Sequence, residues 1–553
     1  QGPPAWASNT PCPLGAVMAP MSVRLYFTFY FARSISAVLF VNIGDSPTAK
    51  TDTDGQQDFV GSDFIADFNN DEKPYFQFDE LWPDKWQDAT AHARWIASRL
   101  DNVTLFRVLY AKRDIFEGQT AELPEFEVPV LKMASAIPGY KPMNKDMAGR
   151  VTAFPTYLAL ASTWDPYIVR EVATAVSEEF LALGANTMLG PAINVHRATQ
   201  HSDNFDSLSG EDPLLGSIMT KAWCLTVHHH GILTVPKFLG RTEQVPVHMG
   251  DRSANETAWE IFYPPFQAAV DSGSAGVMCD AHEVDGIWAC RDINVLKRDL
   301  KGIMGFQGMV VANPGAAMNY FPSDQHSSFE RGLDMAFDEP TTIPPTKRGV
   351  EAMARSAERV LAAIWHMRVT PENSCELPCT KQHKSIARSD KHSEVAKTAA
   401  ASAIVMLKND GELLPLTRDK VKTVALMGPA AAELPLLQPG NGAEGDYYTG
   451  LKEEHINGAL FFSPAFGLWS RGQAKGITVT DNVTGADVCV VVGGSKKNTD
   501  HWKLDNESLS AIDDAVNRCP KVVVLMEIMG AVLLPFRDEV QAMLTVFHAG
   551  EET

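Results

Sequence analysis

Apolar positions along the chain recur in two patterns, which together predict an alternation of helices and strands. Asp165-Pro166 suits the start of a helix, because Asp can cap it and Pro fits its first turn. The apolar residues that follow recur every three or four positions, as on one face of a helix: Ile168, Val172, Val176, Phe180 and Leu183. Short apolar runs bounded by Gly or Pro predict buried strands at 187–190, 233–237, 275–279 and 308–312. Such strands, separated by amphipathic helices, are typical of a parallel sheet or a β/α barrel.

The pattern lapses at residues 367–390, a polar stretch that we interpret as a linker. A second α/β unit follows, with strands predicted at 423–427, 486–492 and 521–526 and a helix at 508–517. The predicted organisation is an irregular N-terminal extension at 1–84, a first α/β domain at 85–366, the linker, and a second α/β domain at 391–553.

Composition and charge narrow the class of protein. Of 553 residues, 45% are hydrophobic and 21% charged, as in a soluble globular protein. With 68 acidic against 48 basic residues the net charge is −20 and no basic block compensates it, which argues against nucleic-acid binding. The apolar stretch 25–41 contains Arg33, so no membrane span is expected there.

No cofactor or metal ion is expected from the motifs. The chain has no phosphate-binding glycine motif, no H-E-x-x-H and no serine-nucleophile elbow. The run His228-His229-His230 is interpreted as a helix end, because adjacent helical residues face different directions.

Eight cysteines are too few for a disulfide scaffold, but two close pairs could be bridged, Cys279 with Cys290 and Cys375 with Cys379. Four sequons would permit glycosylation: Asn102, Asn255, Asn482 and Asn506. We therefore expect an extracellular protein or one of the secretory-pathway lumen.

A series of segments resembles glycoside hydrolase family 3. In the first domain they are Thr152-Ala-Phe-Pro, Ala161-Ser-Thr-Trp-Asp-Pro, Gly190-Pro-Ala-Ile-Asn-Val-His-Arg, Ser209-Gly-Glu-Asp-Pro, 259–270, Val277-Met-Cys with Ala289-Cys290, and 300–310. In the second they are 403–411 and Leu413-Leu-Pro-Leu. The resemblance runs from about residue 85 to the last residue.

The resemblance implies a TIM-like (β/α)8 barrel followed by an α/β sandwich, with a sugar pocket at their junction. The family's members are retaining β-glucosidases, β-xylosidases or β-N-acetylhexosaminidases. Their chemistry needs one carboxylate as nucleophile and a second carboxyl group to protonate the leaving oxygen. The resemblance also implies a Cys279–Cys290 disulfide. It further implies that the sandwich continues beyond His548-Ala-Gly-Glu-Glu-Thr, so the C-terminal domain appears truncated.

The nucleophile position is the main departure from the family. The family's V-x-S-D-W-G-A segment corresponds to 310–316, which places Asn313 at the Asp position. A neutral amide is a very poor nucleophile and cannot form the glycosyl ester.

Three further positions depart from the family pattern. In the K-H-F segment Lys237 is kept and Phe238 replaces His; in G-R-N-x-E the Arg becomes Asp203, followed by Asn204. In the second domain Asp500 and Trp502 fall on the two Glu positions of the segment that supplies the acid/base, Asp500 being nearest to that role.

These departures predict a pseudoenzyme that serves as a scaffold or binding subunit. Two alternatives remain. The first is an active retaining β-glycosidase that uses a displaced carboxylate, with Asp280, Glu283 or Asp203 as candidates. The second is a sugar-binding module without hydrolysis, in which Lys237 and Asn204 donate hydrogen bonds to hydroxyls and Phe238 or Trp502 stacks on a sugar face.

A protein partner is predicted to bind the N-terminal extension. Residues 1–84 carry the aromatic-rich segments 26–31 and 75–86 but lack the pattern needed to fold alone. These aromatic side chains must be buried either against the barrel or against a protein partner. A glycan is a second expected ligand of the chain.

Overall fold

The computed structural model describes residues 85–143, 149–197, 204–240, 256–281, 283–284, 287–313, 325–337, 347–369, 375–432, 447–448, 456, 461–495 and 502–552. Residues 78–553 form one compact unit. The expectations for residues 1–84, and for Asp203, Asn255 and Asp500, lie outside the described residues, and the domain limits stay predictions.

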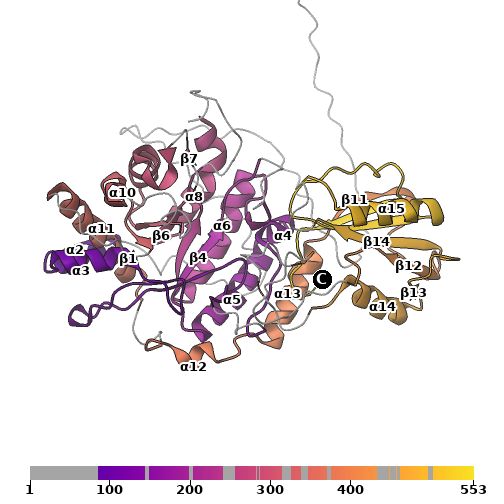
Figure 1. Ribbon diagram of the computed structural model, residues 1–553, viewed down its shortest axis with the longest axis horizontal. Coiled ribbons are helices and arrows are strands. Elements are labelled where there is room, and N and C mark those ends of the chain that lie inside the picture. The colour runs from indigo at the N-terminus through magenta and orange to yellow at the C-terminus, as the bar shows by residue number, and fades with distance from the viewer. Residues whose placement is uncertain are drawn as a thin grey trace, which may run out of the picture. The chain divides into compact units, whose positions relative to one another are not determined.

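The first domain is a closed barrel of eight strands among the described residues (Figure 1). The strands are β1 (Tyr110–Ala111), β2 (Gly118–Gln119), β3 (Lys132–Ser135), β4 (Thr187–Ala192), β5 (Leu233–Lys237), β6 (Gly276–Cys279), β9 (Met309–Ala312) and β10 (Ala336–Phe337). Parallel pairing joins β3 to β4, β4 to β5, β6 to β9 and β10 to β1. Single bridges complete the circle: Leu239 with Cys279, Val311 with Met335, and Lys112 with Gln119.

One strand of the barrel runs against the others. β2 pairs antiparallel with β3, and the bridge to Lys112 is also antiparallel. The sequence did not predict this reversal, because two-residue strands leave no alternating pattern to detect.

Helices cover the barrel, among them the helix that the apolar periodicity predicts after Asp165. They are α2 (Lys85–Ala97), α3 (Asn102–Leu109), α4 (Tyr157–Ser162), α5 (Pro166–Ala182), α6 (Pro213–His229), α8 (Pro264–Asp271), α10 (Gln325–Arg331) and α11 (Lys347–His366). The cap predicted for α5 is present: the Asp165 carboxylate accepts the Tyr167 N–H at 2.8 Å. The predicted stripe is its buried side, with Val172, Val176 and Phe180 fully buried.

Two π-helices occur among the described residues, at Ala258–Phe262 and Asn294–Ile303. Apolar spacing alone does not separate i→i+5 from i→i+4 bonding, so the sequence could not distinguish them. A short hairpin of β7 (Glu283–Val284) and β8 (Ile287–Trp288) follows β6.

The second domain is a six-stranded sheet in the order β11-β16-β15-β14-β12-β13. Its strands are β11 (Val405–Asn409), β12 (Thr423–Met427), β13 (Thr478–Thr480), β14 (Val488–Gly494), β15 (Val522–Glu527) and β16 (Ala542–Val546). Among the described strands of this sheet, only the β11 edge strand pairs antiparallel. Helices α14 (Pro464–Lys475) and α15 (Asn506–Arg518) lie on opposite faces of this sheet (Figure 1). The predicted barrel followed by an α/β sandwich is confirmed.

Two short helices connect the domains. α12 (Thr380–His383) and α13 (Asp390–Ser402) lie between α11 and the edge strand β11. Backbone hydrogen bonds then join the barrel to the second domain, since the Thr156 N–H donates to His548 O at 3.1 Å and the Glu551 N–H donates to Ala153 O at 2.9 Å.

Candidate active site

The candidate site lies at the carboxyl ends of four neighbouring barrel strands, β4, β5, β6 and β9. Active sites of β/α barrels are built at this end, because the strands deliver successive side chains to one rim. The residues at these strand ends are Asn194 after β4, Lys237 and Phe238 at the end of β5, Asp280 after β6 and Asn313 after β9.

Asp280 and Asn313 stand at equivalent positions on adjacent strands. The register pairs Cys279 with Ala312, so the next residue on each strand is Asp280 on one side and Asn313 on the other. The Asp280 N–H donates to Leu239 O at 2.9 Å, and the residue is only 2% exposed. An amide at the predicted nucleophile position therefore has a carboxylate on the neighbouring strand.

Lys237 forms a buried ion pair. Its Nζ lies 3.7 Å from Asp206 Oδ2, and the two side chains are 4% and 3% exposed. Asp206 comes from the short 3-10 helix Asn204–Asp206, which packs near α4. The Lys237 Nζ also lies 5.0 Å from the centroid of the Phe238 ring. Lys237, Phe238 and the Asn204–Asp206 turn are thus brought together, and their role in binding sugar stays a prediction.

Sequence reasoning missed Asn194, which fixes the end of β5. Its side-chain Oδ1 accepts the Phe238 N–H at 2.8 Å, and its Nδ2 donates to Phe238 O at 2.7 Å. The Ile193 N–H donates to Lys237 O at 2.7 Å. The available signal was an amide directly after a buried apolar strand, where a polar side chain needs a partner.

Gly240 leaves room for the Asp280 side chain. A Cβ at Gly240 would lie 3.0 Å from Asp280 Cβ and 3.6 Å from its Oδ2. The close approach of the segments at Gly240 and Asp280 therefore depends on glycine, which has no Cβ.

The second domain reaches this rim through the segment after β15. Met529 packs with Ile137 and Phe205 in one small apolar cluster, and the backbone at Gly530 lies against the Asn204 side chain. Trp502, predicted to bind sugar, accepts the Leu533 N–H at its carbonyl at 2.9 Å and is 37% exposed.

Comparison with known families assigns both domains to one protein family. The glycosyl hydrolase family 3 N-terminal domain matches residues 105–362, and the C-terminal domain of the same family matches residues 404–553. The chain belongs to glycoside hydrolase family 3.

Curated members of the family resemble the chain at moderate identity. A beta-glucosidase B of Emericella nidulans is 27% identical over 62% of this chain and 41% of its own length. A thermostable beta-glucosidase B of Acetivibrio thermocellus is 28% identical over 72% of this chain and 54% of its own, and a Formosa agariphila beta-xylosidase is 25% identical over 55% and 47%. The chain therefore spans about half the length of these relatives.

Solved structures share the fold of this family 3 chain. The beta-D-glucoside glucohydrolase from Trichoderma reesei matches with a TM-score of 0.70 at 22% identity, over 84% of this chain and 71% of that one. DesR, a beta-glucosidase from Streptomyces venezuelae in complex with D-glucose, matches with a TM-score of 0.68 at 18% identity, over 83% and 75%.

Three disulfides lie within the described part of this family 3 chain: Cys279–Cys290, Cys375–Cys379 and Cys489–Cys519. The first closes the hairpin loop that follows Asp280. The third was not predicted, because its cysteines are 30 residues apart and meet only when β14 and the end of α15 are packed together.

No group of three or more metal-binding side chains occurs among the described residues. His228 is buried, with Nδ1 3.1 Å from Ser272 O and Nε2 2.6 Å from Thr234 Oγ1. Burial lowers the pKa of His228 to about 3, so it is a neutral core histidine at the end of α6. In the part of the chain that the structure describes, no helix is long and apolar enough to span a bilayer.

The sequons within the described residues differ in their surroundings. Asn482 lies in an exposed turn and its Oδ1 accepts the Thr484 N–H at 3.0 Å. Asn102 is exposed in the first turn of α3. Asn506 is exposed, but the hydroxyl-bearing Ser508 of its sequon is fully buried against Gly494.

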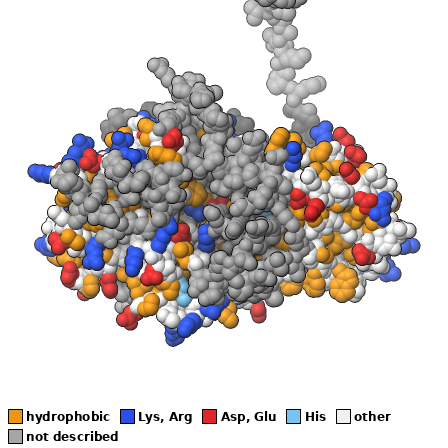
Figure 2. Space-filling model, in the orientation of Figure 1, with side chains coloured by type: hydrophobic (Ala, Val, Ile, Leu, Met, Phe, Trp, Pro, Cys, Tyr) orange, Lys and Arg blue, Asp and Glu red, His pale blue; other side chains and the backbone are white. Residues whose placement is uncertain are grey.

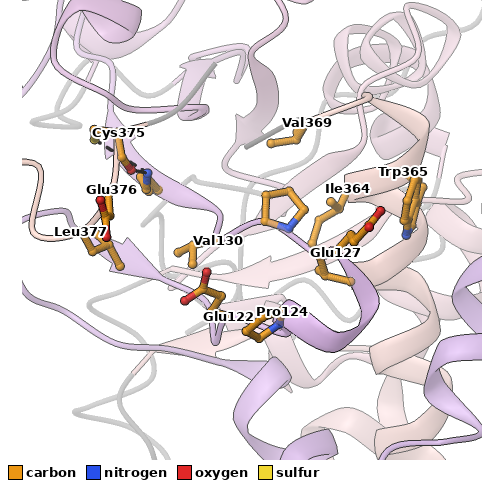
Figure 3. A pocket seen from close by; sticks show the side chains of 13 residues that line it. Glu122, Pro124, Glu127, Val130, Ile364, Trp365, Val369, Cys375, Glu376 and Leu377 are labelled. Atoms are coloured by element: carbon orange, nitrogen blue, oxygen red, sulfur yellow. Dashed lines mark hydrogen bonds between the residues drawn. The ribbon is translucent and has the colours of Figure 1, made fainter. Parts of the chain in front are cut away.

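A cavity of about 830 Å³ opens at the amino end of β3, away from the candidate site. Figure 3 shows it between the start of β3, the end of α11 and the segment 375–377. Lys132 lies in its wall and donates to Cys375 O. The carboxylates that line the cavity, Glu122, Glu127 and Glu376, are exposed, and its buried lysine, Lys132, already donates to a backbone carbonyl.

Acidic and basic side chains are interspersed over the described surface on the face that Figure 2 shows. The net negative charge is therefore not gathered there into one patch.

Proposed function

We propose that the chain is a β-glucosidase-like hydrolase of O-glycosyl bonds, with Asp280 in the role that the family assigns to the residue at position 313. The family assignment and the beta-glucosidases among the named relatives support the reaction class.

The observation that carries this proposal is the register of β6 and β9. The residues after Cys279 and Ala312 face the same rim, so a carboxylate after β6 stands beside Asn313 after β9. A nucleophilic carboxylate attacks the anomeric carbon and the bond to the leaving oxygen breaks; a second carboxyl group protonates that oxygen, and water then hydrolyses the glycosyl ester. Asp500 remains the candidate proton donor.

The sugar would be held by the groups around Lys237. Two hydrogen bonds with the Asn194 side chain hold the Phe238 backbone, and the Phe238 ring offers an apolar surface for a sugar face. Lys237 and Asn204 supply donors for hydroxyls.

Asn313 itself favours a second candidate function. If Asp280, at 2% exposure, does not reach the substrate, the chain is a pseudoenzyme. It then acts as a scaffold, with a partner at residues 1–84, or as a sugar-binding module without hydrolysis.

One experiment separates these functions. The purified chain is incubated with aryl β-glucoside and aryl β-xyloside, in parallel with Asp280→Asn. Turnover that depends on Asp280 supports the hydrolase. If there is no turnover, binding to a glycan array distinguishes the sugar-binding module from the scaffold, and deletion of residues 1–84 tests for loss of a co-purifying partner.

We also propose that the protein is secreted or resides in the secretory pathway. Three disulfides and the exposed sequon at Asn482 suit an oxidising compartment. Mass spectrometry of native material for a glycan on Asn482 tests this.

A further inference from the structure

His392 lies between two carboxylates of the barrel. It is close to the start of α13, the helix that leads into the second domain. Its Nδ1 is 3.0 Å from Glu179 Oε1, and its Nε2 is 2.9 Å from Glu178 Oε2, both on α5. The side chains of His392 and Glu179 are 4% and 0% exposed, whereas that of Glu178 is 39% exposed.

This geometry needs a protonated ring. A neutral imidazole carries one N–H and can donate to only one carboxylate; an imidazolium donates to both. Burial alone would lower the pKa of His392, but the hydrogen bonds to Glu179 and Glu178 outweigh burial and raise it.

Glu179 also forms hydrogen bonds with Thr152, in a barrel segment that precedes α4. Its Oε1 accepts the Thr152 hydroxyl at 2.7 Å, and the Thr152 N–H lies 3.2 Å from both carboxylate oxygens. The next residue, Ala153, donates its N–H to Glu551 of the second domain at 3.2 Å. Arg388, just before α13, donates to Glu551 at 2.9 Å. The segment 152–153 is thus held from both sides by groups that meet around α13.

We propose that His392 is a protonation-dependent lock that fastens α13, and with it the second domain, to the barrel. When the ring loses its proton, one of the two carboxylates loses its donor. If that carboxylate is Glu179, a fully buried charge is left with Thr152 alone among these contacts, which weakens the junction. The lock concerns the domain junction and does not depend on the chain being a hydrolase.

Other charged groups lie near His392, Glu178 and Glu179, and their own titration contributes to the pH dependence of stability. Lys391 lies 3.1 Å from Glu178, and His230, at the end of α6, interacts electrostatically with Glu178. Burial lowers the pKa of His230. Burial also raises the pKa of Glu551 to about 7, although Arg388 opposes this.

The sign of the effect follows from these directions. A histidine whose pKa is raised by folding stabilises the protein fully below its unfolded value of 6.5, and this contribution is lost as pH rises through the folded pKa. Lys301 also titrates in the alkaline range, since burial lowers its pKa to about 8. The informative quantity is therefore the difference between native protein and a His392 variant at each pH.

The test compares the melting temperatures of the native chain and His392→Gln from pH 6 to pH 9. We expect the native protein to melt about 2–4 °C higher at pH 6, and the two curves to converge as pH rises. Lys397→Gln, which removes an exposed lysine of the same helix that pairs with Glu394, is the matched control and should keep the native pH dependence. A constant difference between native protein and His392→Gln across this range would overturn the proposal.

Hydrogen exchange separates a lock from general stability. At pH 6 the peptides that cover 152–156 and 547–552 should exchange faster in His392→Gln than in native protein, with the interior of α11 unchanged. Equal exchange at the junction would contradict the lock. Should the variant fail to fold, histidine NMR of the native chain decides: a resonance that titrates above 6.5 and is perturbed in Glu178→Gln supports the proposal, and its absence refutes it.

Discussion

Asp280 and Asn313 follow a register pair, Cys279 with Ala312, on two adjacent parallel strands. An amide therefore follows one strand, at the position that the sequence resemblance assigns to the nucleophile, and a carboxylate follows the adjacent strand. The proposed role of Asp280 can therefore be tested by substituting Asp280 and Asn313 one at a time.

Gly240 is expected to control the placement of Asp280. Gly240→Ala puts a Cβ 3.0 Å from Asp280 Cβ, so the strand end or the carboxylate must shift. Overpacking of this kind costs about 1–3 kcal/mol. We expect a lower melting temperature together with loss of any turnover or sugar binding. Gly467→Ala, where nothing lies within 4 Å of the added carbon, serves as control and should lower neither, because Ala is favoured over Gly inside helix α14.

The Lys237–Asp206 pair is expected to hold the pocket together. Lys237→Met leaves the buried Asp206 carboxylate without its lysine, and breaking a buried pair costs about 3–5 kcal/mol. Urea unfolding measures this loss. Lys397→Met, in an exposed pair with Glu394, should cost less than about 1 kcal/mol. Similar small losses for both variants would show that the buried pair does not organise the site.

The raised pKa of Glu551 predicts that the free energy of unfolding changes with pH below pH 7. Burial raises the pKa of this carboxyl from 4.5 to about 7, so the folded chain binds a proton that the unfolded chain has released between these values. Stability should therefore fall by up to about 3 kcal/mol as pH rises from 4.5 to 7. Glu551→Gln should remove this slope from the free energy of unfolding; an unchanged slope would assign it to other groups.

The Cys279–Cys290 disulfide closes the loop that follows Asp280. Replacing both cysteines by Ser should lower stability by about 2–3 kcal/mol, as expected for a loop of this length. Thermal unfolding with and without reductant measures the effect. Replacing the Cys489–Cys519 pair, which is remote from the strand ends, should leave sugar binding intact, whereas loss of binding there would show a general effect of unfolding.

Much of the fold could be predicted from sequence, because the signals were local. The runs at 233–237 and 423–427 are β5 and β12 residue for residue, and the Asp165 cap begins α5 as expected. The antiparallel β2 could not be predicted, since pairing direction depends on residues far apart in sequence.

The candidate site was predicted only in part. The family resemblance located Lys237, Phe238 and Asn313, but not their contacts. Asn194 and the His392 cluster depend on segments 44 and about 213 residues apart meeting in space. Asp280 was one of three displaced-carboxylate candidates, and only the strand register places it beside Asn313.

The most direct test of this account is the rate of aryl β-glucoside hydrolysis by the purified chain, beside its Asp280→Asn and Glu260→Gln variants. Glu260 is an exposed carboxylate on the π-helix before α8 and controls for loss of charge. We predict measurable turnover that falls by about 10⁴-fold or more in Asp280→Asn and is kept in Glu260→Gln. Turnover that survives Asp280→Asn, or a native chain with no turnover above the blank, would contradict the account.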